Sequence, residues 1–202
     1  MKSKTVTSAV RVLSLLLLVS ATCALAQDRR QVHFSGLLND YSPTSTISGS
    51  PYEMHGRWSM DLHERGTADF LAEMTMSDNG TTNGVLDPLK GGQGAHTHHI
   101  RLTNMKIIWN IIGCPAYGTP VPTDGFQIMG TVSLLTGNGN GAPFETTPTS
   151  STLQVCILGG SELLYSNMEM MFGGPAAIKH FGSQPIHGVV SKPVLDAAAK
   201  DQ

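Results

Sequence analysis

The feature that most constrains this chain is an alternation of apolar and polar residues, which is strict from Tyr52 to Leu62 and is repeated from Thr67 to Met76. Successive side chains of an extended strand point to opposite faces, so a period of two predicts strands with one buried face. The apolar residues that share the face predicted to be buried are Tyr52, Met54, Trp58, Met60, Leu62, Ala68, Phe70, Ala72, Met74 and Met76. The polar face of its first run carries Glu53, His55, Arg57 and Asp61.

The segment Glu64-Arg65-Gly66 has the length of a three-residue hairpin turn, with Gly66 at the position that needs a positive φ. Pairing His63 with Thr67 then sets the register of the two strands. It places Trp58 opposite Ala72 and Arg57 opposite Glu73, which is a favourable cross-strand pair. A slip of one residue would place Trp58 against Glu73, so we expect this register to be well specified.

Short runs of this kind recur along the chain, separated by segments rich in Gly (22 residues) and Pro (11 residues). No amphipathic helical stretch of useful length accompanies them, so the pattern predicts an all-β fold. We expect a single antiparallel β-barrel or β-sandwich of about eight strands with long Gly/Pro-rich loops. The expected strands are 32–38, 52–62, 67–76, 95–103, 105–112, 125–135, 151–158 and 162–172.

Residues 1–26 predict a cleaved secretory signal peptide. Lys2, Lys4 and Arg11 precede the apolar run Val12–Val19, and Ala24-Leu25-Ala26 supplies the small-x-small cleavage pattern. The apolar run is shorter than the about 20 residues that span a bilayer. We therefore expect a secreted or periplasmic protein without a membrane span, in which residues 27–202 form a single all-β domain with a short C-terminal tail.

Cys114 and Cys156 are the cysteines that remain after the predicted cleavage. In an exported chain such a pair indicates a disulfide, with two separate buried thiols as the alternative. The formal net charge is −2 and becomes more negative without the basic leader. An acidic chain without basic clusters argues against a nucleic-acid partner.

The segment Ala95-His96-Thr97-His98-His99-Ile100-Arg101-Leu102 carries the strongest chemical signal. On a strand His96 and His98 share a face and lie about 7 Å apart along the chain, a spacing that suits two imidazole ligands of one Zn²⁺ or Cu²⁺ ion. They also share that face with Ile100 and Leu102. If this face is the buried one, both imidazoles point inward and need a metal, an acid or a carbonyl as partner.

Two ligands do not make a metal site, and the chain offers several further candidates. These are His55, Glu53, His63, His180 and His187, of which His55 is the third ligand that we favour. With Glu53 and Arg57, His55 would extend a polar ligand-binding patch around His96 and His98, provided that the polar face of its strand lines a cavity. We interpret the ten methionines as core filling, with copper–thioether coordination as the alternative.

Three functions remain open from these residues. The first is an exported β-domain that binds a small ligand or a metal ion, Zn or Cu, at the histidine-containing patch. The second is an enzyme with a site in the barrel lumen, using either a metal or a histidine as acid and base. The third is a surface interaction protein whose histidines are structural. Exposure of the Glu53/His55/Arg57 face to solvent would favour the third function over the other two.

Overall fold

The computed structural model describes residues 32–45, 51–78, 81–82, 85–86, 94–109, 114, 125–139, 144, 146–161, 164–191 and 194–195. These residues belong to a compact unit, Gln31–Gln202, and the chain has a second unit, Met1–Arg30. The predicted signal peptide lies outside the described residues, as does most of the predicted C-terminal tail. The boundary at residue 26 therefore stays a prediction.

The described part of the chain is almost entirely β-structure, with one short helix, α2 (Pro175–Phe181). The strands are β1 (Val32–Ser45), β2 (Pro51–His63), β3 (Thr67–Asp78), β4 (Thr81–Thr82), β5 (Val85–Leu86), β6 (His96–Lys106), β7 (Gly125–Thr131), β8 (Leu134–Gly139), β9 (Thr152–Ser161), β10 (Leu164–Gly173), β11 (Ile186–Val190) and β12 (Val194–Leu195). The prediction of an all-β fold is confirmed.

The β2–β3 hairpin has the predicted register. Trp58 pairs with Ala72, Arg57 with Glu73 and His63 with Thr67, and Gly66 in the turn has a φ of 72°. Burial alternates along β3, with Ala68, Phe70, Ala72, Met74 and Met76 inward, because one face of the hairpin packs on the core. The alternation in the sequence was therefore sufficient to specify both the pairing and the buried face.

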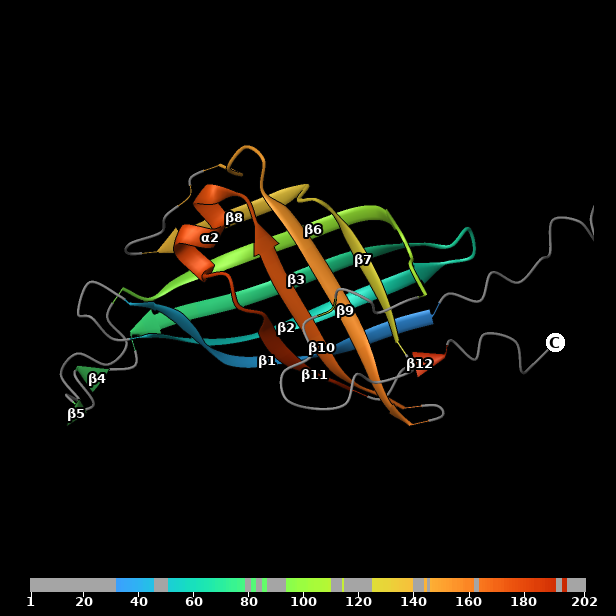
Figure 1. Ribbon diagram of the computed structural model, residues 1–202, viewed down its shortest axis with the longest axis horizontal. Coiled ribbons are helices and arrows are strands. Elements are labelled where there is room, and N and C mark those ends of the chain that lie inside the picture. Colours follow the sequence, from blue (N-terminus) through green and yellow to red (C-terminus); the bar gives the residue numbers. More distant parts are fainter. Residues whose placement is uncertain are drawn as a thin grey trace, which may run out of the picture. The chain divides into compact units, whose positions relative to one another are not determined.

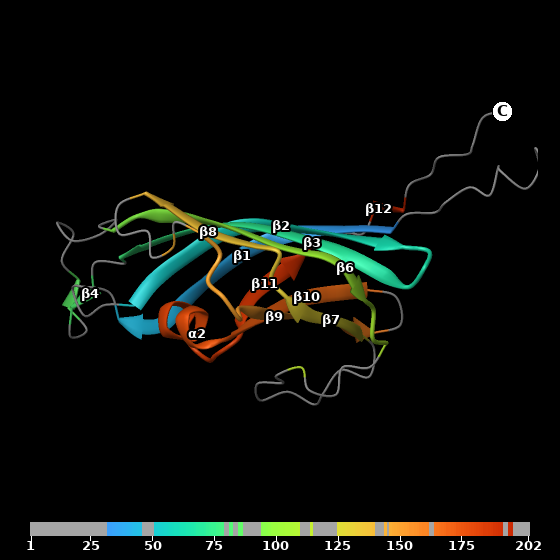
Figure 2. The ribbon, with the colours of Figure 1, turned by 90° about the horizontal axis from the view of Figure 1, so that it is seen from above.

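The main sheet is antiparallel and has the order β7-β9-β10-β11-β1-β2-β3-β6-β8, with the short strand β12 paired to β1 (Figure 1). Its two outermost strands, β7 and β8, are separated in the chain by only Val132 and Ser133. The sheet must therefore curl until its ends meet, and Figure 2 shows the two resulting layers. An isolated bridge between Ile108, two residues after the end of β6, and Gln127 of β7 is made by two N–H···O bonds of 2.9 Å.

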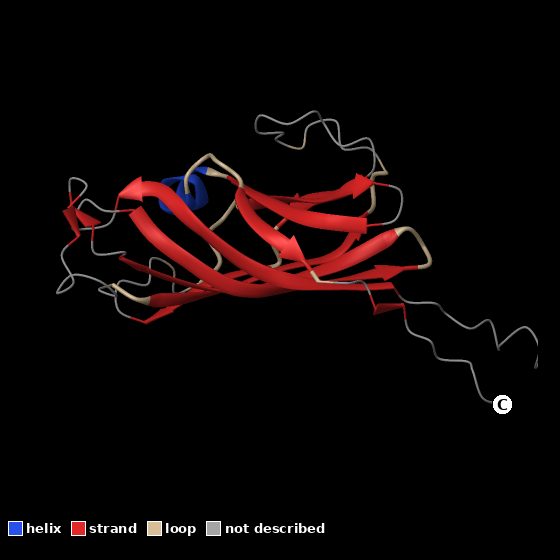
Figure 3. Ribbon diagram, turned by 90° about the horizontal axis from the view of Figure 1, so that it is seen from below, coloured by secondary structure: helices blue, strands red, loops and turns tan. Residues whose placement is uncertain are grey.

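The core fills the space enclosed by the curled sheet. Apolar side chains from the inner faces of β2, β3 and β6 meet those of β7, β9 and β10, and Phe70, Phe126, Ile100 and Leu153 are among the largest that are fully buried. The helix α2 packs against one end of this core through Ala177 and Phe181 (Figure 3). The Cys114–Cys156 disulfide is present, as predicted, and links β9 to the segment before β7.

Several predicted boundaries differ from the structure. Of the predicted strand 105–112, the described residues 105–109 do not form a strand of their own, because Met105 and Lys106 end β6 and Ile108 contributes only the isolated bridge. Residues 110–112 lie outside the described residues. The predicted strand 125–135 is divided into β7 and β8 where the chain changes partners from β9 to β6. The helix α2 and the strand β11 lie in a segment that the sequence analysis did not assign to any element.

Candidate metal centre

His96 and His98 both project from β6 into the interior. Their side chains share a face with Ile100 and Leu102, and their residues are 2 % and 0 % exposed. The conditional prediction that two imidazoles turn inward together is therefore confirmed. Burial on this scale requires partners for the ring nitrogens, because an unpartnered polar group costs free energy when it leaves water.

The third imidazole comes from α2, far away in the sequence. This helix begins with Pro175 after Gly174 (φ 93°), and it ends at Gly182 (φ 88°), whose N–H donates to the carbonyl of Ile178. Phe181 stacks on Phe172 of β10 with ring centroids 4.1 Å apart, which anchors the helix to the sheet. The neighbouring His180 is thereby held against β6.

The Nε2 atoms of the three histidines converge. His180 Nε2 lies 3.1 Å from His96 Nε2 and 3.0 Å from His98 Nε2, and the three ligand atoms all lie within 4.8 Å of one another. Three nitrogens bound tetrahedrally to one ion at about 2.0–2.1 Å would be roughly 3.3 Å apart. The two short separations are close to that value, so small ring movements would complete a coordination sphere.

Hydrogen bonds to the backbone orient two of these rings. His96 Nδ1 lies 2.7 Å from the carbonyl oxygen of Gly94, and His98 Nδ1 lies 2.8 Å from that of Thr136. A carbonyl oxygen only accepts, so each Nδ1 donates an N–H, and the neutral ring presents a lone pair at Nε2. Metal-binding histidines are typically held by this arrangement, with the second nitrogen donating to a carbonyl or carboxylate.

Burial and neighbouring charges lower the pKa of two of the three histidines. Burial, followed by the neighbouring His180 and His96, lowers the pKa of His98 from 6.5 to about 3. Burial and the charge of His96 lower the pKa of His180 to about 4. Both imidazoles are therefore available as neutral ligands at pH 7, and little proton release accompanies their use.

Aromatic rings surround the three histidines. The Tyr52 ring meets His96 edge-on at a centroid distance of 5.5 Å and lies 5.8 Å from His180. Phe144 lies 5.7 Å from His180, and Phe181 lies 4.8 Å from His98. Burial and the nearby Asp78 raise the pKa of Tyr52, so its phenol stays protonated. These rings limit the access of water to the nitrogens.

The structure does not bring the predicted residues Glu53, His55 and Arg57 to this cluster. They lie on the outer face of β2, where His55 pairs with Glu53 (3.1 Å) and Arg57 with Glu73 (2.5 Å). The side chains of His55 and Arg57 are 52 % and 75 % exposed. His180 therefore takes the place that the sequence analysis gave to His55, and a ligand-binding role for the outer residues stays a prediction.

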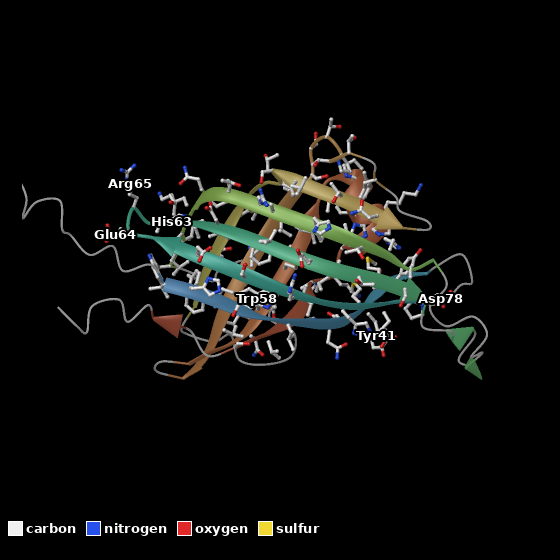
Figure 4. All side chains as sticks on the ribbon, turned by 180° about the vertical axis from the view of Figure 1, so that it is seen from behind. Tyr41, Trp58, His63, Glu64, Arg65 and Asp78 are labelled. Atoms are coloured by element: carbon white, nitrogen blue, oxygen red, sulfur yellow. A yellow bond between two sulfur atoms is a disulfide. The ribbon has the colours of Figure 1, made fainter. Side chains whose placement is uncertain are left out.

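The outer face of the sheet, opposite the three histidines, carries a groove. This groove of about 420 Å³ is lined by residues that include Leu37, Arg57, Leu71 and Glu73. Figure 4 views the sheet from this side, with Trp58 near the middle, the turn residues Glu64 and Arg65 at one end and Asp78 at the other. The two remaining candidate ligands also lie apart from the cluster, because His63 pairs with Asp69 and His187 with Asp40.

The sequence contained a signal for the placement of His180 that the analysis did not use. Pro175 follows a glycine, Ala177 and Phe181 are apolar at a spacing of four, and Gly182 follows directly. This is the pattern of a short helix with a proline in its first turn and a glycine after its last. The same pattern does not reveal which strand the helix packs against.

Comparisons with known proteins leave the function open. No protein-family model matches the chain, and neither the curated proteins nor the solved structures contain a significant match. Within the described part of the chain, no helix has both the length and the apolar character needed to cross a membrane. The geometry of His96, His98 and His180 is therefore the main evidence for a function.

Proposed function

We propose that this protein binds one transition-metal ion through the Nε2 atoms of His96, His98 and His180. The observation that carries the proposal is the convergence of the three nitrogens. The lone pairs of His96 and His98 both face His180 Nε2, at 3.1 and 3.0 Å. One N–H on His180 points in a single direction and cannot satisfy both of them, whereas one cation satisfies all three nitrogens.

Imidazole nitrogen suits Zn, Cu, Ni and Fe, and Zn or Cu agrees best with three neutral nitrogen ligands and no carboxylate in the group. Two ligands project from the rigid strand β6 and one from α2. Binding would therefore connect the helix to the sheet and add to the stability of the folded state.

We further propose that the protein is exported, to the periplasm or the medium. The leader-like pattern of residues 1–26 and the Cys114–Cys156 disulfide both support this proposal. Burial of His96 and His98 under aromatic rings supports retention of an ion more than turnover of a substrate, so we place the enzymatic alternative second to binding.

Metal titration of untagged protein, stripped with a chelator, tests the binding proposal. We expect one equivalent of Zn²⁺ or Cu²⁺ to bind, and we expect His180→Ala to lower the affinity by about 100-fold or more, since it removes one of three ligands. His55→Ala is the matched control, because this exposed histidine lies on the opposite face of the sheet. Less than a few tenths of an equivalent, unchanged in a His96→Ala/His98→Ala double variant, would overturn the proposal.

A surface interaction protein is the second candidate function, because the Glu53/His55/Arg57 face lies exposed to solvent, which is the outcome expected for it. The groove beside Arg57 also supports binding at this outer face. A small ligand or a protein partner that uses the groove would lose affinity in an Arg57→Ala variant and retain it in His180→Ala. The two variants therefore separate the inner site from the outer one.

A further inference from the structure

Two methionines of β3 lie directly beside the metal-binding histidines of β6. The register pairs Met74 with His98 and Met76 with His96. Both methionines are fully buried and project from the same inner face of the sheet as the two imidazoles. On the other side of β3, Met54 of β2 pairs with Met76 and is 1 % exposed.

This pairing makes a methionine the cross-strand neighbour of each of the two histidines. Residues directly opposite each other on one face of an antiparallel pair have Cβ atoms about 4.5–5.5 Å apart. A methionine sulfur is two bonds beyond its Cβ on an unbranched, adaptable side chain. Each histidine of β6 therefore has a soft donor as its neighbour across the strand pair.

The charge of the surroundings is a second, independent observation. The group that could hold an ion consists of three histidines and contains no carboxylate. Among the described residues, the buried acids are Asp78, two positions after Met76 on the same strand, and Glu169 of β10. Imidazole and thioether donors carry no negative charge, so a monovalent ion would leave less uncompensated charge in this buried site than a divalent one.

We propose that the site is selective for Cu(I), held by the imidazoles of His96, His98 and His180 with a thioether of β3, from Met74 or Met76, as an additional ligand. Thioether and imidazole donors together suit Cu(I), whereas Zn²⁺ is bound by thiolate, imidazole or carboxylate. The inference rests on the proposed function, because it names the ion that the three histidines would hold.

The test compares Cu(I) and Zn²⁺ affinities of the same variants of the full mature protein. Cu(I) is titrated anaerobically against a chromogenic Cu(I) chelator, and Zn²⁺ against a chromogenic Zn²⁺ chelator. We expect Met74→Leu/Met76→Leu to weaken Cu(I) binding by about tenfold or more and to change Zn²⁺ binding less than about twofold, since leucine keeps the volume but not the sulfur. Met60→Leu is the control, because Met60 is equally buried but pairs with Phe70, nearer the hairpin turn.

X-ray absorption spectroscopy at the copper edge of the Cu(I)-loaded wild-type protein is a second test, and it does not depend on whether any variant folds. We expect a sulfur scatterer beside nitrogen in the first coordination shell of copper. Nitrogen alone, or an unchanged Cu(I) affinity in the double leucine variant, would overturn the thioether ligand while leaving the histidine site intact. Failure of His180→Ala to weaken either ion would instead overturn the proposed function itself.

Discussion

Acidification should destabilise the metal-free protein through His98. This ring is fully buried, its Nδ1 donates to the carbonyl of Thr136, and its pKa in the folded state is about 3 against 6.5 for an ordinary histidine. In the unfolded chain the same ring takes up a proton as the pH falls below about 6.5. Between the two pKa values, the unfolded state binds more protons than the folded state.

The sign of the effect follows from that difference. Stability must fall as the pH falls through the window from about 6.5 to about 3, and it must recover as the pH rises. Each pH unit within the window costs about 1.4 kcal/mol for one proton, so His98 alone should lower the free energy of unfolding by about 2 kcal/mol at pH 5. His180, with a pKa of about 4, acts in the same direction, with a smaller effect because it is partly exposed.

Urea unfolding in the presence of a chelator, followed by tryptophan fluorescence between pH 5 and pH 7, measures this slope. His98→Leu should reduce the slope by about one proton, whatever its effect on stability at pH 7. A slope that is the same in the wild type and in His98→Leu would refute the argument.

Three further predictions concern the fold around the site. Reduction of the Cys114–Cys156 disulfide, which closes a separation of 42 residues, should lower the free energy of unfolding by about 4 kcal/mol in urea titrations. Gly36→Ala should cost about 3 kcal/mol or more in the same assay, because its Cβ would lie 1.8 Å from the carbonyl oxygen of Val189; a cost below about 1 kcal/mol would contradict the packing. Phe181→Ala should lower the free energy of unfolding by about 3–5 kcal/mol and also weaken metal binding, since it removes the ring stack that holds α2. Full retention of metal affinity would show that this stack does not position His180.

Local patterns were sufficient for part of the structure. The alternation in the two runs between Tyr52 and Met76 and the turn at Gly66 specified the hairpin with its register. A slip of one residue would move the apolar side chains of one strand from the buried face to the solvent face. The parity of His96 and His98 with Ile100 and Leu102 likewise predicted that both rings point inward. Predictions that depended on one strand and its immediate neighbour were therefore the reliable ones.

The prediction of His55 as the third ligand differs from the group that the structure brings together, because local patterns do not predict contacts between distant segments. His55 lies on the polar face of β2, and the curled sheet turns this face toward solvent. There His55 pairs with Glu53. His180 lies 82 residues from His98 in the chain, and their Nε2 atoms are 3.0 Å apart. No local pattern encodes that contact.

The amino-acid sequence by itself determined the strands with clear alternation and the hairpin, since a period of two acts over a few residues at a time. It predicted the inward direction of His96 and His98 on the condition that the face with Ile100 and Leu102 is buried. The tertiary structure alone decided the closing contact between the ends of the sheet, the docking of α2 and the completion of the group by His180. These depend on how the whole sheet curls and on the stacking of Phe181 against Phe172, which are properties of packing between distant segments.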